Sequence, residues 1–203
     1  MALLTAILDP GLFGAEIEDW GQPVTLPAPE EALVQKAAPK RQREFALGRA
    51  CARRALEKLG HGNAVIGRGA NGAPLWPEGI TGSITHTRDY AAALVGAART
   101  FSGIGVDAER VGGVTEDLWS RLFDDAERDH LMGLDAAVRP VIATLFFSAK
   151  EACYKAWGGV GALAFREICV TPGDLRFTAV RSGEILRGRY AVAGDLMLTA
   201  VWF

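Results

Sequence analysis

The chain has 203 residues, of which 49% are hydrophobic and 23% are charged. This composition is typical of a globular protein and excludes a disordered chain, which lacks the apolar surface that offsets the entropy cost of ordering. With a formal net charge of −2, the chain has no overall positive potential that would attract nucleic acid, so phosphate recognition would need local clusters of Lys and Arg. The length predicts one large domain or two small ones.

The apolar stretches of the sequence are too short to span a membrane. The longest, Ala2–Leu8 and Ala91–Ala98, fall far below the ~20 residues that a spanning helix needs. No basic segment precedes the first of them, and Asp9-Pro10 ends it, unlike a secretory signal. The three cysteines form neither a paired framework nor a CxxC metal motif. We therefore expect a cytoplasmic protein.

In the first half of the chain, Ala2–Leu8 is predicted to be a strand. Pro29–Ala38 is predicted to be a short helix, since Glu30 and Glu31 favour a first turn. Lys40–Leu59 is the clearest helix, closed by Gly60. Three strands are predicted after it: Gly82–His86, Tyr90–Val95 and Ile104–Glu109.

The second half repeats this plan. Thr115 is predicted to cap a helix that runs to about Met132. A longer helix is predicted to begin with Pro140 at its first position and to end before Gly158. Four strands are expected near residues 165–170, 175–180, 185–191 and 196–202. Both halves thus predict a strand, helices and a meander, which favours an α+β fold of two similar lobes, residues 1–110 and 111–203.

Two arginines of the helix Lys40–Leu59 lie beside its apolar face. Arg49 lies at the edge of the predicted buried arc, and Arg53 follows one turn later. Charges are rarely buried without a partner, so each needs an anion. An internal carboxylate would serve, and so would a phosphate, whose oxygens match the guanidinium fork. The helix pattern leaves both open.

Asp107 and Glu109 lie two residues apart on a predicted strand and therefore face the same side. Parallel carboxylates repel unless a cation lies between them, and Mg²⁺ prefers a few carboxylates with water and substrate phosphates. The alternative is a strand end that enters solvent, with Arg110 neutralising one charge. This pattern alone does not separate the two.

Glu151 and Lys155 are spaced i and i+4 on the helix that begins at Pro140, opposite its apolar stripe. Such a pair is usually an exposed salt bridge. However, Phe147 and Tyr154 share this face, and a helix that is apolar on both sides is usually buried between layers. Glu151 and Lys155 would then form an enclosed acid and base.

Taken in order, five segments resemble the 4′-phosphopantetheinyl transferases of the Sfp type, in the branch of the enterobactin synthase component D. The segments are Gly48-Arg49-Ala-Cys-Ala-Arg53, Gly72-x-Pro74-x-Trp76-Pro77, Gly82-Ser-Ile-Thr-His86, Gly105-Val-Asp107-Ala-Glu109 and Phe147-Ser-Ala-Lys150-Glu151-x-x-Tyr154-Lys155-Ala156. The resemblance spans roughly residues 40–160. It implies two similar lobes related by a pseudo-two-fold duplication, with the active site in the cleft between them.

The resemblance implies an enzyme that moves phosphopantetheine from coenzyme A to a serine of an apo acyl or peptidyl carrier protein, releasing 3′,5′-ADP. It implies that Asp107, Glu109 and Glu151 hold Mg²⁺. It also implies that Glu151 acts as general base, and that Lys155 meets the charge on the phosphoryl group or protonates the leaving group. The expected partners are peptidyl, aryl or acyl carrier domains of siderophore, nonribosomal peptide, polyketide or fatty-acid systems, with no nucleic acid or membrane, and the chain is expected to be a monomer.

The same resemblance implies a nucleotide site. It places its phosphate-binding residues in the matching motifs of this chain: Arg49, Arg53, Thr85 and His86. The Gly72–Pro74 turn gives close backbone approach beside Trp76, as an adenine neighbour requires. Family members often carry a lysine in this turn and this chain has none, so Arg68, the nearest basic residue, is expected to replace it.

Two other functions use the same residues. A Mg²⁺-dependent phosphodiesterase that hydrolyses coenzyme A or nucleotides would need no carrier protein, and a silent coenzyme A-binding module would need no catalytic pair. Ser83 and His86 also suggest a hydrolase, but the sequence lacks a Gly-x-Ser-x-Gly elbow. The presence of Glu151 and Lys155 beside the predicted metal ligands favours the transferase over the silent module.

Overall fold

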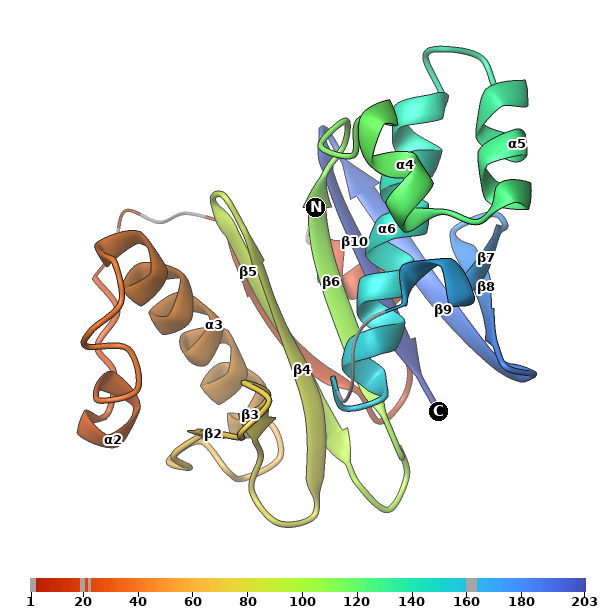
Figure 1. Ribbon diagram of the computed structural model, residues 1–203. Helices are drawn as coiled ribbons and strands as arrows, with labels where there is room; N and C mark the ends of the chain where they lie inside the picture. The colour runs from red at the N-terminus through yellow and green to blue at the C-terminus, as the bar shows by residue number, and fades with distance from the viewer. Residues whose placement is uncertain (1–2, 19–20, 22, 160–163) are drawn as a thin grey trace.

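A computed structural model describes residues 3–18, 21, 23–159 and 164–203. Figure 1 shows two antiparallel sheets side by side, each with a long helix against it. In the first sheet, β5 (Tyr90–Ala97) lies between β1 (Phe13–Ile17) and β4 (Ile80–Thr87). The helix α3 (Pro39–Glu57) packs against this sheet, with the short α2 (Ala28–Glu31) beside it.

The second sheet has five strands in the order β6-β10-β9-β8-β7, and the helix α6 (Arg139–Ala156) packs against it. Its strands are β6 (Ile104–Arg110), β7 (Cys169–Pro172), β8 (Arg176–Arg181), β9 (Glu184–Ala193) and β10 (Leu196–Trp202). Two short helices, α4 (Glu116–Leu122) and α5 (Asp125–Gly133), connect β6 to α6. Within the described part of the chain, no helix is long and apolar enough to cross a membrane.

The two halves share one topology. In each half a first strand, a long helix and a last pair of strands follow in this order, with shorter elements between them and with β7 and β8 added in the second half. In both halves the first strand pairs with the last, which pairs with the one before it. β1, α3, β4 and β5 therefore correspond to β6, α6, β9 and β10. The predicted α+β fold of two similar lobes is confirmed. The division after residue 110 stays a prediction, and strand pairing places β6 in the second sheet.

The sheets meet where β4 lies against β6. The backbone N–H of Ala108 donates to Thr85 Oγ1 at 3.0 Å, which ties β6 to β4. On the other side of β6, Gly105 lies so close to α6 that a Cβ there would be 1.8 Å from the carbonyl oxygen of Ala152. This close approach puts one face of β6 directly under α6.

The N-terminal segment is a helix, α1 (Leu3–Ile7), and the strand predicted for Ala2–Leu8 is wrong. Leu3, Leu4 and Ile7 are buried against the second sheet and β1, which a helix achieves because residues three and four apart share a face. A short apolar run without alternation does not distinguish a helix from a buried strand.

The single helix predicted from Thr115 to about Met132 is two helices in the structure. α4 ends at Leu122, and Asp124 begins α5 with a capping box in which its carboxylate accepts from the N–H of Glu127 at 2.8 Å. Thr115 makes no side-chain cap hydrogen bond. The helix predicted for Pro29–Ala38 ends at Glu31, and residues 165–167 form a 3₁₀ turn (Phe165–Glu167) instead of the start of a strand.

A short hairpin not expected from the sequence, β2 (Gly67–Arg68) and β3 (Pro74–Leu75), lies beside β4 and the lower end of α3 in Figure 1. The strand β1 (Phe13–Ile17) was not expected from the sequence either. The remaining strands and the long helices lie close to their predicted positions. Pro39 at the start of α3 and the proline at the second position of α6 fit helix N-termini, since proline lacks only an N–H that would be unpaired there.

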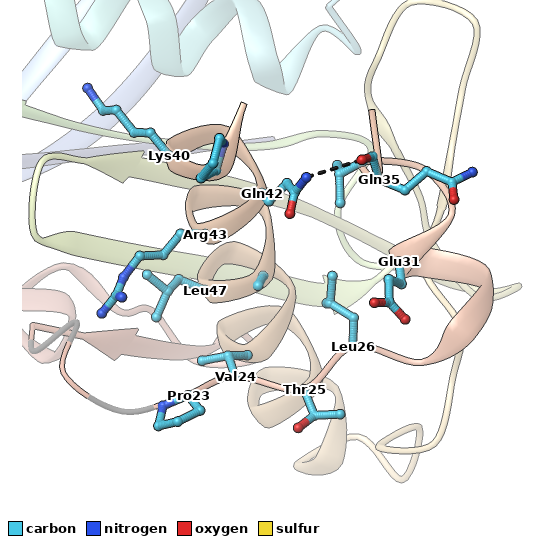
Figure 2. A pocket seen from close by; sticks show the side chains of 13 residues that line it. Pro23, Val24, Thr25, Leu26, Glu31, Gln35, Lys40, Gln42, Arg43 and Leu47 are labelled. Carbon is cyan, nitrogen blue, oxygen red and sulfur yellow. Dashed lines mark hydrogen bonds between the residues drawn. The ribbon is translucent and has the colours of Figure 1, made fainter. Parts of the chain in front are cut away.

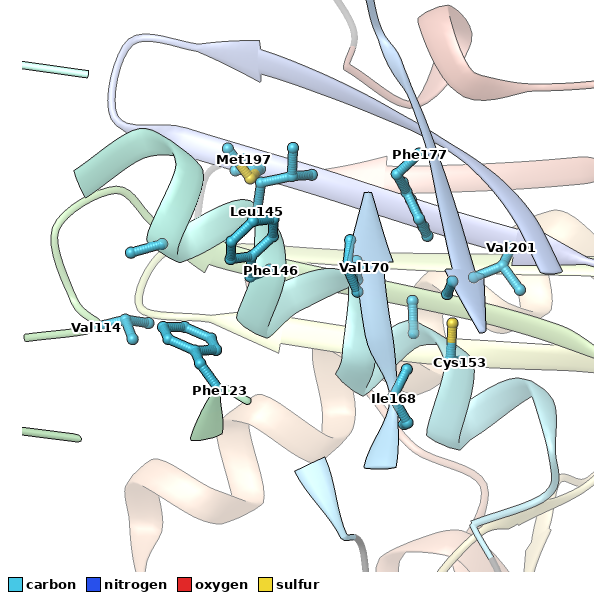
Figure 3. Close-up of a cluster of buried hydrophobic side chains, with 14 of the residues drawn as sticks. Val114, Phe123, Leu145, Phe146, Cys153, Ile168, Val170, Phe177, Met197 and Val201 are labelled. Atoms are coloured by element: carbon cyan, nitrogen blue, oxygen red, sulfur yellow. The ribbon is translucent and has the colours of Figure 1, made fainter. Parts of the chain in front are cut away.

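A hydrophobic cluster fixes the rotation of α6 on its sheet (Figure 3). Leu145, Phe146 and Cys153 of α6 meet Phe177, Met197 and Val201 of the strands, and each is at most 3% exposed. Burying a side chain of this size contributes about 1.5–3 kcal/mol. Because this stripe faces the second sheet, the side chains of Ser148, Glu151 and Lys155 emerge beside β6 and the edge of β4.

Candidate active site

Asp107 is the centre of a hydrogen-bonded cluster between β4, β6 and α6. Its side chain is only about 6% exposed. One carboxylate oxygen, Oδ1, accepts from Lys155 Nζ at 2.7 Å and from Thr85 Oγ1 at 3.3 Å. The other, Oδ2, accepts from Ser148 Oγ at 2.8 Å. The structure thus brings together Thr85, Asp107 and Lys155, three residues predicted from separate motifs.

Lys155 does not form the exposed salt bridge with Glu151 that i, i+4 spacing would predict. Its ammonium pairs with Asp107 and also donates to the backbone carbonyl of Val106 at 3.2 Å. Phe147, on the same helix face, stacks on Phe165 with 5.4 Å between ring centroids. This face of α6 is therefore partly enclosed, as an acid and base in a site require.

Glu109 and Glu151 lie within the field of Asp107. Burial, together with the negative charges of Asp107 and Glu151, raises the pKa of Glu109 to about 7, although the Lys155 ammonium opposes this rise. Burial likewise raises the pKa of Glu151, and Lys155 lowers it. Three half-buried or buried carboxylates with one ammonium leave an excess of negative charge.

This excess fits a divalent cation. Carboxylate oxygens are the ligands that Mg²⁺ takes in proteins, and the raised pKa of Glu109 shows that its anion lacks a compensating charge. Among the residues that the structure describes, no three His, Cys, Asp or Glu side chains are gathered closely enough to hold a metal ion. Asp107, Glu109 and Glu151 thus carry oxygen donors of the type that Mg²⁺ takes, but in this structure they are not gathered into a metal site, and the Lys155 ammonium lies beside Asp107 instead.

A second cluster, which is cationic, lies at the start of α3. A hollow of about 130 Å³ is lined by Arg41, Arg49, Arg68, Gly72 and His86, among others. Arg49 is only 3% exposed, and its Nη2 donates to the carbonyl of Gly67 at 2.8 Å. Burial, together with the positive charges of Arg53 and Arg68, lowers the pKa of its guanidinium to about 10, although the Glu30 carboxylate opposes this change.

Arg49 lacks part of its hydrogen bonding. Its buried Nε has no hydrogen-bond partner within the described parts of the chain. A guanidinium can donate five hydrogen bonds, and a buried unsatisfied donor costs about 1–3 kcal/mol. One carboxylate, Glu44, also lines this hollow and lies 3.5 Å from Arg41 Nη1. Three arginines and a histidine outnumber it, so the hollow suits an anion with several acceptor oxygens.

Arg53 has a different partner. Its Nη1 donates to Glu30 Oε2 at 2.6 Å, and Glu30 is fully buried and also accepts from the N–H of Ile66 at 2.9 Å. Of the two anions left open by the helix pattern, the internal carboxylate is the one that Arg53 has in this structure. A contact between Arg53 and a phosphate stays a prediction.

Arg41 is a site residue that the sequence did not single out. Its Nη1 donates to His86 Nε2 at 2.7 Å, which leaves the imidazole proton on Nδ1 because arginine only donates. Burial lowers the pKa of His86, and Arg41 contributes to that lowering. The spacing gave one signal: Arg41 lies one turn before Phe45 and two turns before Arg49 on α3.

A larger cleft of about 740 Å³ continues from this hollow between the two lobes. Both are lined by Gly72 and Pro74, and the cleft reaches Lys155 on α6. Trp76 lines it too, its indole N–H donating to the carbonyl of Gly82 at 3.0 Å. At the rim, Asn71 Nδ2 donates to the carbonyl of Gly158 at 2.8 Å and joins the two lobes.

Two further cavities border the lobes. An apolar one of about 430 Å³ opens beside Glu109 and is lined by Val114, Leu122, Phe147 and Phe165, among others. A groove of about 840 Å³ lies on the other side of α3, between α2 and the segment Pro23–Leu26 (Figure 2). It is the largest of the cavities described here, and none of the predicted site residues lines it.

Two family models match the chain. The model described as the 4′-phosphopantetheinyl transferase N-terminal domain matches residues 29–96, and that of the 4′-phosphopantetheinyl transferase superfamily matches residues 103–193. The first match ends in β5 and the second begins just before β6, while β1 and β10 lie outside both matches.

Curated relatives agree with these matches. The chain is 38% identical to the 4′-phosphopantetheinyl transferase Npt of Nocardia iowensis over 171 residues, which cover 83% of this chain and 76% of that protein. It is 39% identical to the 4′-phosphopantetheinyl transferase Svp of Streptomyces mobaraensis over 196 residues, 88% and 79% of the two chains. Enterobactin synthase component D of Salmonella typhi is 36% identical over 131 residues, 64% and 53%. A holo-(acyl-carrier-protein) synthase structure from Bacillus anthracis matches with a TM-score of 0.45 and 26% identity, covering 50% of this chain and 95% of that one.

Proposed function

The chain belongs to the 4′-phosphopantetheinyl transferases, and from this premise we propose that it transfers phosphopantetheine from coenzyme A to a serine of an apo carrier protein. The observation that carries the assignment of roles is the cluster around Asp107, where β6 and α6 bring three carboxylates and one ammonium to the end of a cleft lined by cationic residues.

In the proposed reaction, the serine oxygen attacks the phosphorus that bears the pantetheine arm. The new Ser O–P bond forms as the pyrophosphate P–O bond breaks, and 3′,5′-ADP leaves with the bonding electron pair. Glu151 takes the serine proton, for which its raised pKa makes it a better base than an ordinary carboxylate. Lys155 lies between the lobes and neutralises charge that develops on the transferred group.

Asp107, Glu109 and Glu151 would hold Mg²⁺, which when bound neutralises the pyrophosphate charge. The role of these three carboxylates themselves would be to bind the ion and to fix its position. Asp107 is fixed by hydrogen bonds from two lobes, and Glu109 lies two residues along the same face of β6. Catalysis of phosphoryl transfer depends on such positioning more than on covalent chemistry.

Arg41, Arg49, Arg68 and His86 would bind the 3′-phosphate of the nucleotide. The unpartnered Nε of Arg49 and the donor-rich hollow support this assignment. Gly72, Pro74 and Trp76 line the adjoining cleft, where the turn leaves room beside an indole for adenine. The apolar cavity beside Glu109 suits the pantetheine arm, because its lining is aromatic and aliphatic.

Conservative replacement of Glu151 tests these roles. Glu151→Gln keeps the size of the side chain but removes the base, so we expect transfer to fall by at least 100-fold while coenzyme A binding changes little. Release of 3′,5′-ADP with an apo carrier measures transfer, and calorimetry measures binding. Glu57→Gln, at the exposed end of α3, is the matched control. Wild-type turnover in Glu151→Gln would refute the assigned base.

The same assay separates the transferase from the hydrolase. A phosphodiesterase would release 3′,5′-ADP from coenzyme A without a carrier, whereas a transferase releases it only when a carrier serine is present. Peptidyl, aryl and acyl carriers are all suitable acceptors by chemistry. We propose a monomer, because a single chain supplies both lobes that form the cleft. We propose a cytoplasmic location, because Cys51, Cys153 and Cys169 are free thiols, as a reducing compartment keeps them.

A further inference from the structure

Among the described residues that line the cationic hollow, Glu44 of α3 is the only carboxylate. Its side chain is 15% exposed, whereas that of the neighbouring Lys40 is 84% exposed. Oε1 of Glu44 lies 3.9 Å from Lys40 Nζ, while Oε2 lies 3.5 Å from Arg41 Nη1 and 3.9 Å from His86 Nδ1. Solvent screens such an enclosed charge less than a surface charge. Glu44 therefore places negative charge inside a hollow that otherwise suits an anion.

Arg41 has a strong partner and a weak one at the same nitrogen. Its Nη1 carries two protons. The distance to His86 Nε2 is 2.7 Å, which is a short hydrogen bond, whereas the distance to Glu44 Oε2 is 3.5 Å. The contact with Glu44 is the weaker of the two, so it is the one that an incoming anion can replace at the lower cost.

The charges around the hollow give Glu44 opposite effects in the empty and the filled state. In the empty hollow, Arg41, Arg49 and Arg68 repel one another, and the Glu44 carboxylate offsets one of these positive charges. When a phosphate enters this space of about 130 Å³, the carboxylate and the phosphate are like charges in one small volume and repel each other. Glu44 thus stabilises the free protein and weakens anion binding.

We propose that Glu44 is an internal counter-ion that pairs with Arg41 while the hollow is empty and competes with the 3′-phosphate of the nucleotide for this guanidinium. The inference rests on the proposed function, which assigns the hollow to the 3′-phosphate. Coenzyme A and the product 3′,5′-ADP carry the same 3′-phosphate. Glu44 therefore limits how tightly the protein holds the product as well as the substrate, and so favours release of 3′,5′-ADP after transfer.

Four variants separate the charge of Glu44 from its place in the helix. Glu44→Gln and Glu44→Met both remove the charge while keeping the length of the side chain, so the test does not depend on one of them folding well. Glu44→Asp keeps a negative charge in the hollow. Glu57→Gln is the matched control, because Glu57 lies exposed at the far end of the same helix.

Thermal unfolding of the ligand-free chains is the first measurement. Loss of one partly enclosed ion pair should lower the Tm of Glu44→Gln and Glu44→Met by about 2–4 °C in a chain of this size. Glu44→Asp should fall by less, and Glu57→Gln should melt like the wild type. This measurement also confirms that each variant folds.

Calorimetry with coenzyme A, 3′,5′-ADP and dephospho-coenzyme A is the second measurement. Removing a like charge from the hollow should make Glu44→Gln and Glu44→Met bind coenzyme A and 3′,5′-ADP about ten-fold more tightly than the wild type. Dephospho-coenzyme A, which lacks the 3′-phosphate, should gain much less, and Glu44→Asp and Glu57→Gln should stay close to the wild type. A residue with a purely structural role would lose stability and affinity together, whereas a counter-ion loses stability and gains affinity.

The outcomes distinguish the inference from the function on which it rests. If the wild-type chain prefers coenzyme A over dephospho-coenzyme A, but the two charge-removing variants bind coenzyme A no more tightly, the inference fails and the proposed function stands. If the wild-type chain binds both ligands equally, the hollow does not hold the 3′-phosphate, and that assignment fails together with the inference. If it binds neither ligand, the proposed function fails as well.

Discussion

Replacing Gly105 by Ala should separate the two elements that form the catalytic cluster. An added Cβ would lie 1.8 Å from the carbonyl oxygen of Ala152 and 2.9 Å from the backbone nitrogen of Ala156. β6 and α6 must part by about 1.6 Å to restore the 3.4 Å of ordinary contact. Both obstacles are helix backbone, which cannot rotate away as a side chain can. The 2.7 Å contact between Lys155 and Asp107 would not survive this shift.

The cost can be estimated from overpacked cores. Extra methyl groups in a packed core cost about 1–3 kcal/mol, and a clash with backbone belongs at the upper end. For a chain of this size, about 3 kcal/mol lowers Tm by roughly 6–12 °C. Gly133→Ala is the matched control, because an added Cβ there meets nothing within 4 Å and the residue has no positive φ. Calorimetry in which Gly105→Ala melts like Gly133→Ala would refute the close approach.

Three other predictions concern Arg49, Arg53 and His86. Arg49→Ala should weaken the binding of coenzyme A at least ten-fold and that of dephospho-coenzyme A much less, since only coenzyme A carries a 3′-phosphate. Equal losses of affinity for the two ligands in calorimetry would make Arg49 purely structural. Arg53→Ala should lower the free energy of unfolding in urea by about 3–5 kcal/mol, because it leaves the buried Glu30 charge unpaired. A variant that keeps wild-type stability but binds coenzyme A more weakly would instead assign Arg53 to the phosphate. Burial lowers the pKa of His86, so below about pH 6.5 the unfolded chain binds this proton first and stability falls as pH falls. His86→Gln should flatten that slope between pH 7 and 5, and an unchanged slope would contradict it.

Periodicity predicted the catalytic side of the cluster well. Asp107 and Glu109 had to share a strand face, and Glu151 and Lys155 had to share a helix face. Periodicity could not predict that Lys155 pairs with Asp107, because this pairing depends on how β6 packs against α6. Lys155 is paired with Asp107 from another element, and the glycine that permits this contact, Gly105, has no periodicity of its own.

Tertiary packing also explains what was missed in the first lobe. Glu30 was interpreted as a first-turn charge, which is a local role, yet α2 buries it as the partner of Arg53. The sequence did not single out Arg41, because its place in the site depends on β4, which brings His86 against it. The break between α4 and α5 did have a local signal, the Asp124-x-x-Glu127 capping box, but a continuous apolar face concealed it.

The central claim is that this chain moves phosphopantetheine onto carrier proteins with a magnesium-dependent cluster at Asp107. Intact-mass spectrometry of an apo carrier, incubated with the chain, coenzyme A and Mg²⁺, tests it most directly. The account predicts a phosphopantetheine adduct on the carrier that EDTA abolishes and added Mg²⁺ restores. Unmodified peptidyl, aryl and acyl carriers, with coenzyme A consumed all the same, would contradict it and make the chain a hydrolase.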